Sequence, residues 1–311
     1  MKYKYLVFIP MLLTSCMRSS SYNITTILPL GAPSICFFDQ GKNNDFVTAT
    51  PSSIVPLFQN PDPIYDALII DSRTGLLQSK KHNSPYKMAK LLTSGNLYLV
   101  GLNENKIAPS SNSIIYGFQE NEIPGLIFKH IIHNCFHLDE SRINWVDNAS
   151  LIAPIAKEGL YQGKKVDYVL IAEPTLYSIK SSSKSAISTY EESLRLLWHN
   201  LTNQDEIPQA ALFINKNAYA RKKQQFDNYL SDLNARIDIA INDINKVKEK
   251  MDQYGDKDMQ NIRFGFNADI IINVQKNNGL ALYSKEYKVD KMNAFLDQLH
   301  LENYTSEDFI I

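Results

Sequence analysis

The amino-acid sequence predicts an α/β fold. Short apolar runs alternate with helical patterns along most of the 311 residues, as they do where helices cover a sheet. Hydrophobic residues make up 44% of the chain and charged residues 21%, which is the balance of a globular protein with a sizeable core. The net charge is −1 and no basic cluster stands out, so the composition does not indicate a nucleic-acid-binding protein.

The first elements follow from apolar runs that are separated by turn residues. Thr50 and Pro51 form a favourable helix start, because proline fits the first helical position. The segment 71–75 follows a buried apolar run and is expected to be a loop. Strands are expected at 24–30, 45–49, 65–70, 86–93 and 96–102, and helices at 34–38 and 51–59.

A second set of alternating elements occupies the middle of the chain, without an internal repeat. The segments 117–121 and 181–185 are expected to be a loop and a flexible turn. A final amphipathic helix is expected at 290–299. Strands are expected at 113–116, 143–146, 166–171 and 210–214, and helices at 123–134, 149–158 and 174–179.

An apolar stripe lies in the last third of the chain. Its members recur four and three residues apart, which is typical of one face of a helix. They are Phe226, Leu230, Leu233, Ile237, Ala240, Ile244, Val247 and Met251. We expect this helix to pack on the α/β body. The stripe also fits about three and a half heptads, so coiled-coil association is the alternative.

The amino terminus has the layout of a secretion signal. Lys2 and Lys4 precede an apolar stretch at 5–13, which is shorter than the ~20 residues needed to cross a bilayer. The stretch ends in Leu13-Thr14-Ser15-Cys16, which resembles the bacterial lipobox. This resemblance implies cleavage before Cys16 and a lipid anchor on its sulfur. Residues 1–15 are then a lipoprotein signal peptide and 16–23 a tether; an ordinary signal with a chance cysteine is the alternative.

Several stretches, in order along nearly the whole mature chain, resemble one protein family. They are Leu28-Pro29-Leu30-Gly31-Ala32-Pro33, Asp66-Ala67-Leu68-Ile69-Ile70, Leu91-Leu92-Thr93-Ser94-Gly95-Asn96-Leu97-Tyr98-Leu99-Val100, Tyr116-Gly117-Phe118-Gln119-Glu120, Val166-Asp167-Tyr168-Val169-Leu170-Ile171-Ala172-Glu173-Pro174, Pro208-Gln209-Ala210-Ala211-Leu212-Phe213-Ile214-Asn215-Lys216 and Glu307-Asp308-Phe309-Ile310-Ile311. The family is that of the nitrate/taurine (sulfonate)-type substrate-binding proteins of ABC transporters. Its fold is the two-lobed type II periplasmic-binding fold.

The resemblance implies a domain organisation and a function. One lobe would hold 24–99 plus 216–311 and the other 100–215, with crossover strands at 97–101 and 213–216. The chain would be a monomeric lipoprotein on the outer face of the bacterial cell membrane. It would deliver a small solute to an ABC permease, without enzymatic activity or a cofactor. Alternatives are a surface adhesin or interaction lipoprotein of the same fold, a metal-binding protein, or an enzyme of pyrimidine synthesis.

The candidate ligand residues lie in loops at the carboxyl ends of strands, where such sheets bind ligands and helix N-termini offer free N–H groups. They are Gly31, Ala32, Pro33, Ser34, Ser72, Arg73, Thr74, Ser94, Asn96, Tyr98, Gly117, Phe118, Gln119, Glu173 and Gln209. Arg73 could clamp an anionic group, which favours an anionic or polar planar solute, or it could pair with Asp71. Glu173 could accept from an amine or be structural. Tyr98 and Phe118 could stack on a planar ligand, or Phe118 could belong to the core.

The remaining cysteines and histidines support no catalytic hypothesis. Cys36 and Cys135 are expected in different lobes, as free and buried thiols. His130, His133, Cys135 and His137 are residue types that bind zinc or copper, but the spacing lacks a second pair of ligands and the cluster is expected far from the cleft. The sequence contains no Gly-x-Ser-x-Gly, P-loop or His-Glu-x-x-His motif.

Overall fold

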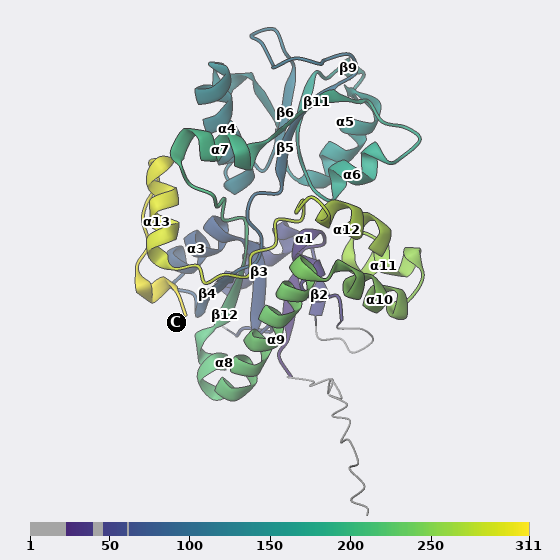
Figure 1. The fold of residues 1–311 in the computed structure, drawn as a ribbon. Helices are drawn as coiled ribbons and strands as arrows, with labels where there is room; N and C mark the ends of the chain where they lie inside the picture. Colours follow the sequence, from purple (N-terminus) through teal and green to yellow (C-terminus); the bar gives the residue numbers. More distant parts are fainter. Residues whose placement is uncertain (1–22, 40–45, 61, 311) are drawn as a thin grey trace, which may run out of the picture.

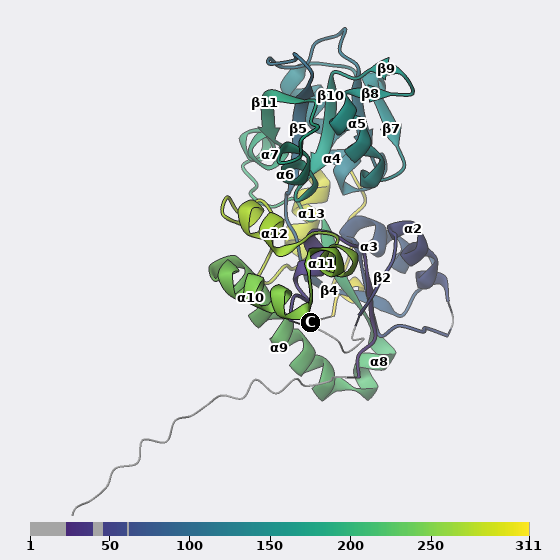
Figure 2. The same cartoon turned by 90° about the vertical axis from the view of Figure 1, so that its right-hand side faces the viewer.

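The computed structural model describes residues 23–39, 46–60 and 62–310. Two five-stranded sheets, each covered by helices, lie one above the other along the long axis of the molecule (Figure 1), and the view turned by 90° shows the same arrangement (Figure 2). This confirms the α/β class and the two-lobed architecture. The predicted signal peptide, Cys16 as the predicted site of the lipid, and most of the predicted tether lie outside the described residues.

The first sheet has the strand order β2-β1-β3-β12-β4. Its strands are β1 (Thr26–Leu28), β2 (Phe46–Thr48), β3 (Ala67–Asp71), β4 (Tyr86–Leu91) and β12 (Ala210–Asn215). The helices that follow these strands in the chain are α1 (Ala32–Ile35), α2 (Pro51–Ile54), which continues as a 3-10 turn at Val55–Gln59, α3 (Ser72–Lys81) and α8 (Lys216–Arg221). Every residue of β12 is buried, which explains why this strand is a continuous apolar run in the sequence.

The second sheet has the strand order β11-β5-β10-β6-β7. Its strands are β5 (Leu97–Leu102), β6 (Ile115–Phe118), β7 (Ile143–Val146), β10 (Tyr168–Ala172) and β11 (Ile187–Ser193). Its helices are α4 (Ile123–Phe136), α5 (Ile152–Glu158), α6 (Thr175–Lys180) and α7 (Leu194–Thr202), and β8 (Leu160–Tyr161) pairs with β9 (Lys164–Lys165) in a small hairpin. Short 3-10 turns lie at Glu140–Arg142 and Ala149–Leu151.

The last third of the chain is helical, as predicted, but the helix expected at 226–251 is two helices. The helices of this region are α9 (Lys223–Asn242), α10 (Ile244–Tyr254), α11 (Lys257–Phe264), α12 (Ala268–Gln275) and α13 (Val289–Gln298), and a 3-10 turn lies at Ser306–Asp308. Asp243 leaves the helical conformation at φ −141 and ψ 67, and its side chain caps α10. Phe226, Leu233, Val247 and Met251 are fully buried, which confirms packing on the body. None of the helices in the described ranges is both long and apolar enough to cross a membrane.

The chain crosses between the sheets twice, at 92–96 and at 203–209. Ser94 and Pro208 of these two segments form an isolated antiparallel bridge. The predicted boundary between residues 99 and 100 falls inside β5, which lies wholly in the second sheet. The boundary after residue 215 assigned 210–215 to the second lobe, whereas β12 pairs with β3 and β4 of the first sheet.

The segment 71–75 is not the loop that was expected, because Asp71 ends β3 and caps α3, which begins at Ser72. Oδ1 of Asp71 accepts the N–H of Thr74 at 2.9 Å, which starts the helix directly after β3. Gly75 serves the contact between this helix and the sheet, because a Cβ on Gly75 would lie 2.3 Å from the ring of Phe213. The helices α7, α11 and α12 and the strand β11 were not predicted either.

We expect Gly75→Ala to destabilise the protein by about 1–3 kcal/mol, because the added methyl group overpacks the contact with Phe213. Urea unfolding followed by circular dichroism measures the change. Phe213→Leu makes room beside residue 75, so in that background the alanine should cost clearly less. Equal costs in the two backgrounds would show that the contact with Phe213 is not the cause.

Candidate ligand site between the two sheets

The carboxyl ends of strands from the two sheets face each other across a short gap. β3 ends at Asp71 and β6 ends at Phe118, just before the loop that leads into α4. Oδ2 of Asp71 accepts the N–H of Ile123 at 3.1 Å, and Nη1 of Arg73 donates to the carbonyl oxygen of Asn121 at 2.8 Å. These hydrogen bonds join the two lobes where open α/β sheets bind their ligands.

A second carboxyl group, that of Glu122, lies near Asp71. It accepts a hydrogen bond from Nε2 of Gln119 at 2.6 Å. Burial, and then the charge of Asp71, raise the pKa of Glu122 to about 8. Burial also raises the pKa of Asp71 to about 6, although the N–H groups of Thr74 and Ile123 act in the opposite direction. Burial and mutual repulsion therefore disfavour the simultaneous ionisation of the two groups.

Three predicted ligand residues hold the crossing segments together. Oε1 of Gln209 accepts the N–H groups of Gly95 and Asn96, at 2.8 and 2.9 Å. Nδ2 of Asn96 donates to the carbonyl oxygen of Glu173 at 2.7 Å, and Oγ of Ser94 accepts the N–H of Ile207 at 3.0 Å. These polar groups build the junction from which both lobes extend.

Glu173 and Tyr98 lie at the edge of this junction. Oε2 of Glu173 accepts the N–H of Tyr177 in the first turn of α6, at 2.9 Å. Burial raises the pKa of Glu173 to about 7, and burial together with the charge of Glu173 raises the pKa of Tyr98. A Cβ on Gly279 would lie 3.5 Å from Cγ of Glu173, so this glutamate packs against a segment of the other lobe.

The structure uses several other predicted residues in local packing. Ser34 is fully buried, with Oγ 2.7 Å from the carbonyl oxygens of both Gly31 and Phe264. The N–H of Gly31 also donates to Phe264 at 3.2 Å, so the chain itself covers the start of α1, which contains Ala32 and Pro33. The hydroxyl of Ser72 is buried and donates to the carbonyl oxygen of Pro208 at 2.5 Å.

Gly117 and Phe118 both pack within the second lobe. Phe118 is 2% exposed and belongs to the hydrophobic core. This agrees with the alternative role of core packing, and not with stacking on a ligand. A Cβ on Gly117 would lie 2.5 Å from the ring of Trp145. Glycine at this position of β6 therefore leaves room for the Trp145 ring of β7. Sequence reasoning missed Glu122. It placed Asp71 and Asn121 in candidate ligand loops without assigning them a contact with the other lobe, although Asp71 before the first turn of α3 carries an N-cap signal.

A pocket of about 290 Å³ opens beside the pair of carboxyl groups, at the carboxyl ends of β6 and β7. It is lined by Gln119, Glu120, Asn121, Glu122, Trp145, Val146 and Asp147. Nζ of Lys129 pairs with Glu120 at 2.9 Å and lies 5.4 Å from the centre of the Trp145 ring. The pocket therefore combines an aromatic wall with amide and carboxyl groups that can bind a polar solute.

The histidine cluster lies at the other end of α4. A pocket of about 600 Å³ there is lined by His133, His137, Leu138, Asp139 and Glu140. The ring of His130 instead packs on Trp198, with 5.4 Å between ring centres. In the part of the chain that the structure describes, no group of three or more His, Cys, Asp or Glu residues could hold a metal ion. Cys36 and Cys135 are free; Cys36 is buried, but Cys135 is half-buried and not buried as expected.

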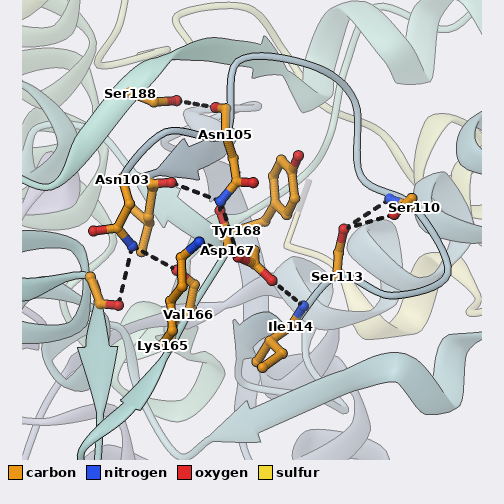
Figure 3. A network of polar contacts seen from close by, with 12 residues as sticks. Asn103, Asn105, Ser110, Ser113, Ile114, Lys165, Val166, Asp167, Tyr168 and Ser188 are labelled. Atoms are coloured by element: carbon orange, nitrogen blue, oxygen red, sulfur yellow. Dashed lines mark hydrogen bonds and ion pairs between the residues drawn. The ribbon is translucent and has the colours of Figure 1, made fainter.

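The polar network in Figure 3 lies at the opposite end of β6 and β10 from the candidate site. Oδ2 of Asp167 accepts the N–H of Ile114 at 2.9 Å, and Oδ1 accepts from Nδ2 of Asn105 at 3.1 Å. Nδ2 of Asn103 donates to the carbonyl oxygen of Val166 at 3.2 Å. This network fixes the loop between β5 and β6, so we assign it a structural role.

Comparisons with solved structures identify the fold as that of the periplasmic binding proteins. The chain is similar to a ligand-binding component of an ABC-type import system from Staphylococcus aureus, solved with zinc bound, at a TM-score of 0.63 and 11% identity over 92% of this chain and 95% of that chain. It is similar to the alkanesulfonate-binding protein of Xanthomonas axonopodis pv. citri bound to MOPS (TM-score 0.59, 10% identity, 90% and 93% covered).

A third similar structure, from Candida albicans, is described as having the generic periplasmic binding protein fold (TM-score 0.58, 11% identity, 89% and 88% covered). No family model and no curated protein sequence matches this chain. At these identities the likeness shows the fold, and it leaves the ligand to be argued from the residues.

The stability of the protein should fall as the pH rises from about 5 to about 8. A carboxyl group whose pKa is raised by folding stabilises the folded state fully below its unfolded pKa of about 4.3, and this contribution is lost as the pH rises through the folded pKa. Glu122→Gln should remove about 1–3 kcal/mol of this pH dependence. The difference in unfolding free energy between the variant and the wild type should therefore be more favourable to the variant at pH 8.5 than at pH 5.

Urea unfolding at the two pH values, followed by tryptophan fluorescence, measures this difference. Glu158→Gln, at the exposed end of α5, is the matched control and should leave the pH dependence of the wild type in place. A parallel pH dependence in wild type and Glu122→Gln would contradict the assignment.

Proposed function

We infer that this chain is an extracytoplasmic solute-binding protein that delivers a small molecule to an ABC importer. The observation that carries this inference is the opposition of strand ends from two sheets, with polar groups of both lobes directed at one gap. Two crossing segments connect the lobes, and a ligand that binds the closed form better can shift such an equilibrium by a hinge motion.

The structural neighbours support the same role. Their names describe a component of an ABC-type import system and an alkanesulfonate-binding protein. An ABC permease is then the partner of this chain, which acts as a monomer and binds its solute without catalysis or a cofactor. The lipobox-like sequence that ends at Cys16 supports a lipid anchor on the outer face of the cell membrane.

The alternatives have less support. An adhesin was expected to use the helical stripe of 226–251 as its contact surface, but the apolar side of that stripe is buried in the body. An enzyme of pyrimidine synthesis or a metal-binding protein was expected to use the histidine cluster. That cluster lies at the end of α4 away from the facing strand ends.

Native mass spectrometry of the purified chain should reveal a co-purified small molecule that is released on unfolding. The identified compound, at a hundred times its Kd, should then stabilise the protein by about 2.7 kcal/mol. Trp145→Ala should weaken its binding about tenfold or more, because the Trp145 ring forms the aromatic wall of the pocket. Tyr161→Ala, in the distant β8–β9 hairpin, is the control. Absence of both a bound compound and stabilisation by any member of a solute library would refute the proposal.

The lipid anchor can be tested separately. The wild-type chain should incorporate an alkyne analogue of palmitate and sediment with membranes, because Cys16 carries the lipid. Cys16→Ser should abolish both, whereas Cys135→Ser should abolish neither. Labelling that survives Cys16→Ser would place the modification elsewhere, and a wild-type chain that takes up no label would show an ordinary signal peptide.

A further inference from the structure

The N-terminus of α4 is capped by a residue of the facing lobe. Glu122 occupies the N-cap position of α4 but makes no side-chain cap, and Pro124 has no N–H. The N–H of Ile123 donates instead to Oδ2 of Asp71 at 3.1 Å. The other oxygen of this carboxylate accepts the N–H of Thr74 in α3 at 2.9 Å. One carboxylate thus binds the first turns of two helices that belong to different sheets.

This position is the one that an anionic group of a solute would take. Converging helix N-termini offer partial positive charge and unpaired N–H groups, which bind carboxylate, sulfonate or phosphate oxygens. The helices α3 and α4 have ten and fourteen residues, so both have well-developed N-terminal turns. A solute anion would therefore have to compete with Asp71 for the same two donors.

The surrounding charges add to this exclusion. The carboxyl group of Glu122 lies close enough to Asp71 for their charges to interact, so a bound anion would meet the charge of Asp71 and would further disfavour the ionisation of Glu122. Arg73 also acts on Asp71 electrostatically, but its Nη1 already donates to the carbonyl oxygen of Asn121. The charge of Asp71 also acts on the hydroxyl of Tyr304.

We propose that Asp71 determines the charge specificity of the site. Its carboxylate takes the place of an anionic ligand group between α3 and α4, holds the two lobes together, and so restricts the site to solutes without a negatively charged group. This inference rests on the proposed function as a solute receptor. It reverses the preference for an anion that Arg73 suggested in the sequence.

The test compares Asp71→Ala and Asp71→Asn with Asp256→Ala in the full chain carrying Cys16→Ser. Asp256 caps α11 through the N–H of Met259 at 2.9 Å, so it controls for the loss of a helix cap within one lobe. Asp71→Asn preserves a capping residue for α3 and guards against a failure to fold. The probes are MOPS and inorganic sulfate, measured by isothermal titration calorimetry, and the lobe separation is measured by small-angle X-ray scattering.

Asp71→Ala should bind MOPS or sulfate at least about tenfold more tightly than the wild type and Asp256→Ala, because two helix N-termini become free. Asp71→Asn removes the negative charge but keeps a cap, so it should also bind these anions more tightly than the wild type, by a smaller factor. Asp71→Ala should also have a larger radius of gyration without a probe. Equal anion binding in wild type and variants, or an anionic co-purified solute, would overturn the role of Asp71 while the receptor function stands. If no solute is found but the variants expand and gain sulfate, the receptor function fails and the role of Asp71 in closing the lobes stands.

Discussion

The side chain of Gln209 fixes how the two sheets face each other. Its Oε1 accepts the N–H groups of Gly95 and Asn96, where the chain leaves the first sheet, and Gln209 itself leads the chain back into β12. The bridge between Ser94 and Pro208 lies next to these hydrogen bonds. Because both crossing segments are joined here, the two lobes are tied together at one junction, and the carboxyl ends of β3 and β6 lie opposite each other.

Burial of carboxyl groups between the lobes links their separation to proton binding. Asp71, Glu122 and Glu173 all have raised pKa values, and burial is the largest cause for each. Opening the lobes would admit water and return these values toward the ordinary range, so opening would release protons near neutral pH. In the proposed hinge motion, a solute bound between the lobes and the protons on these carboxyl groups would therefore act on the same opening equilibrium.

The sequence predicts those parts of the fold that are determined by continuous burial. β3 and β12 are covered on both faces, so their apolar runs are plain in the sequence. β11 is an edge strand with the sequence ISTYEES and no fully buried residue, so it lacks that signal. The positions of the site loops can be predicted from the ends of the strands. The roles of the residues in these loops depend on partners that are distant in the sequence. Ser34 donates a hydrogen bond to the carbonyl oxygen of Phe264, and Ser72 donates one to that of Pro208. No local sequence pattern predicts contacts between residues so far apart in the chain.

The contact between Asp71 and α4 depends on local backbone geometry in the loop before that helix. Gln119 has φ 53, and its side chain binds the carboxyl group of Glu122, which therefore does not cap α4. Gly125 allows this loop to fold back on the first turn, because a Cβ there would lie 2.4 Å from the carbonyl oxygen of Gln119. The N–H of Ile123 is thus left without a partner in its own lobe. A buried N–H needs an acceptor, and Asp71 of the facing lobe supplies it. The backbone conformation of the loop before α4 therefore determines a contact between the lobes.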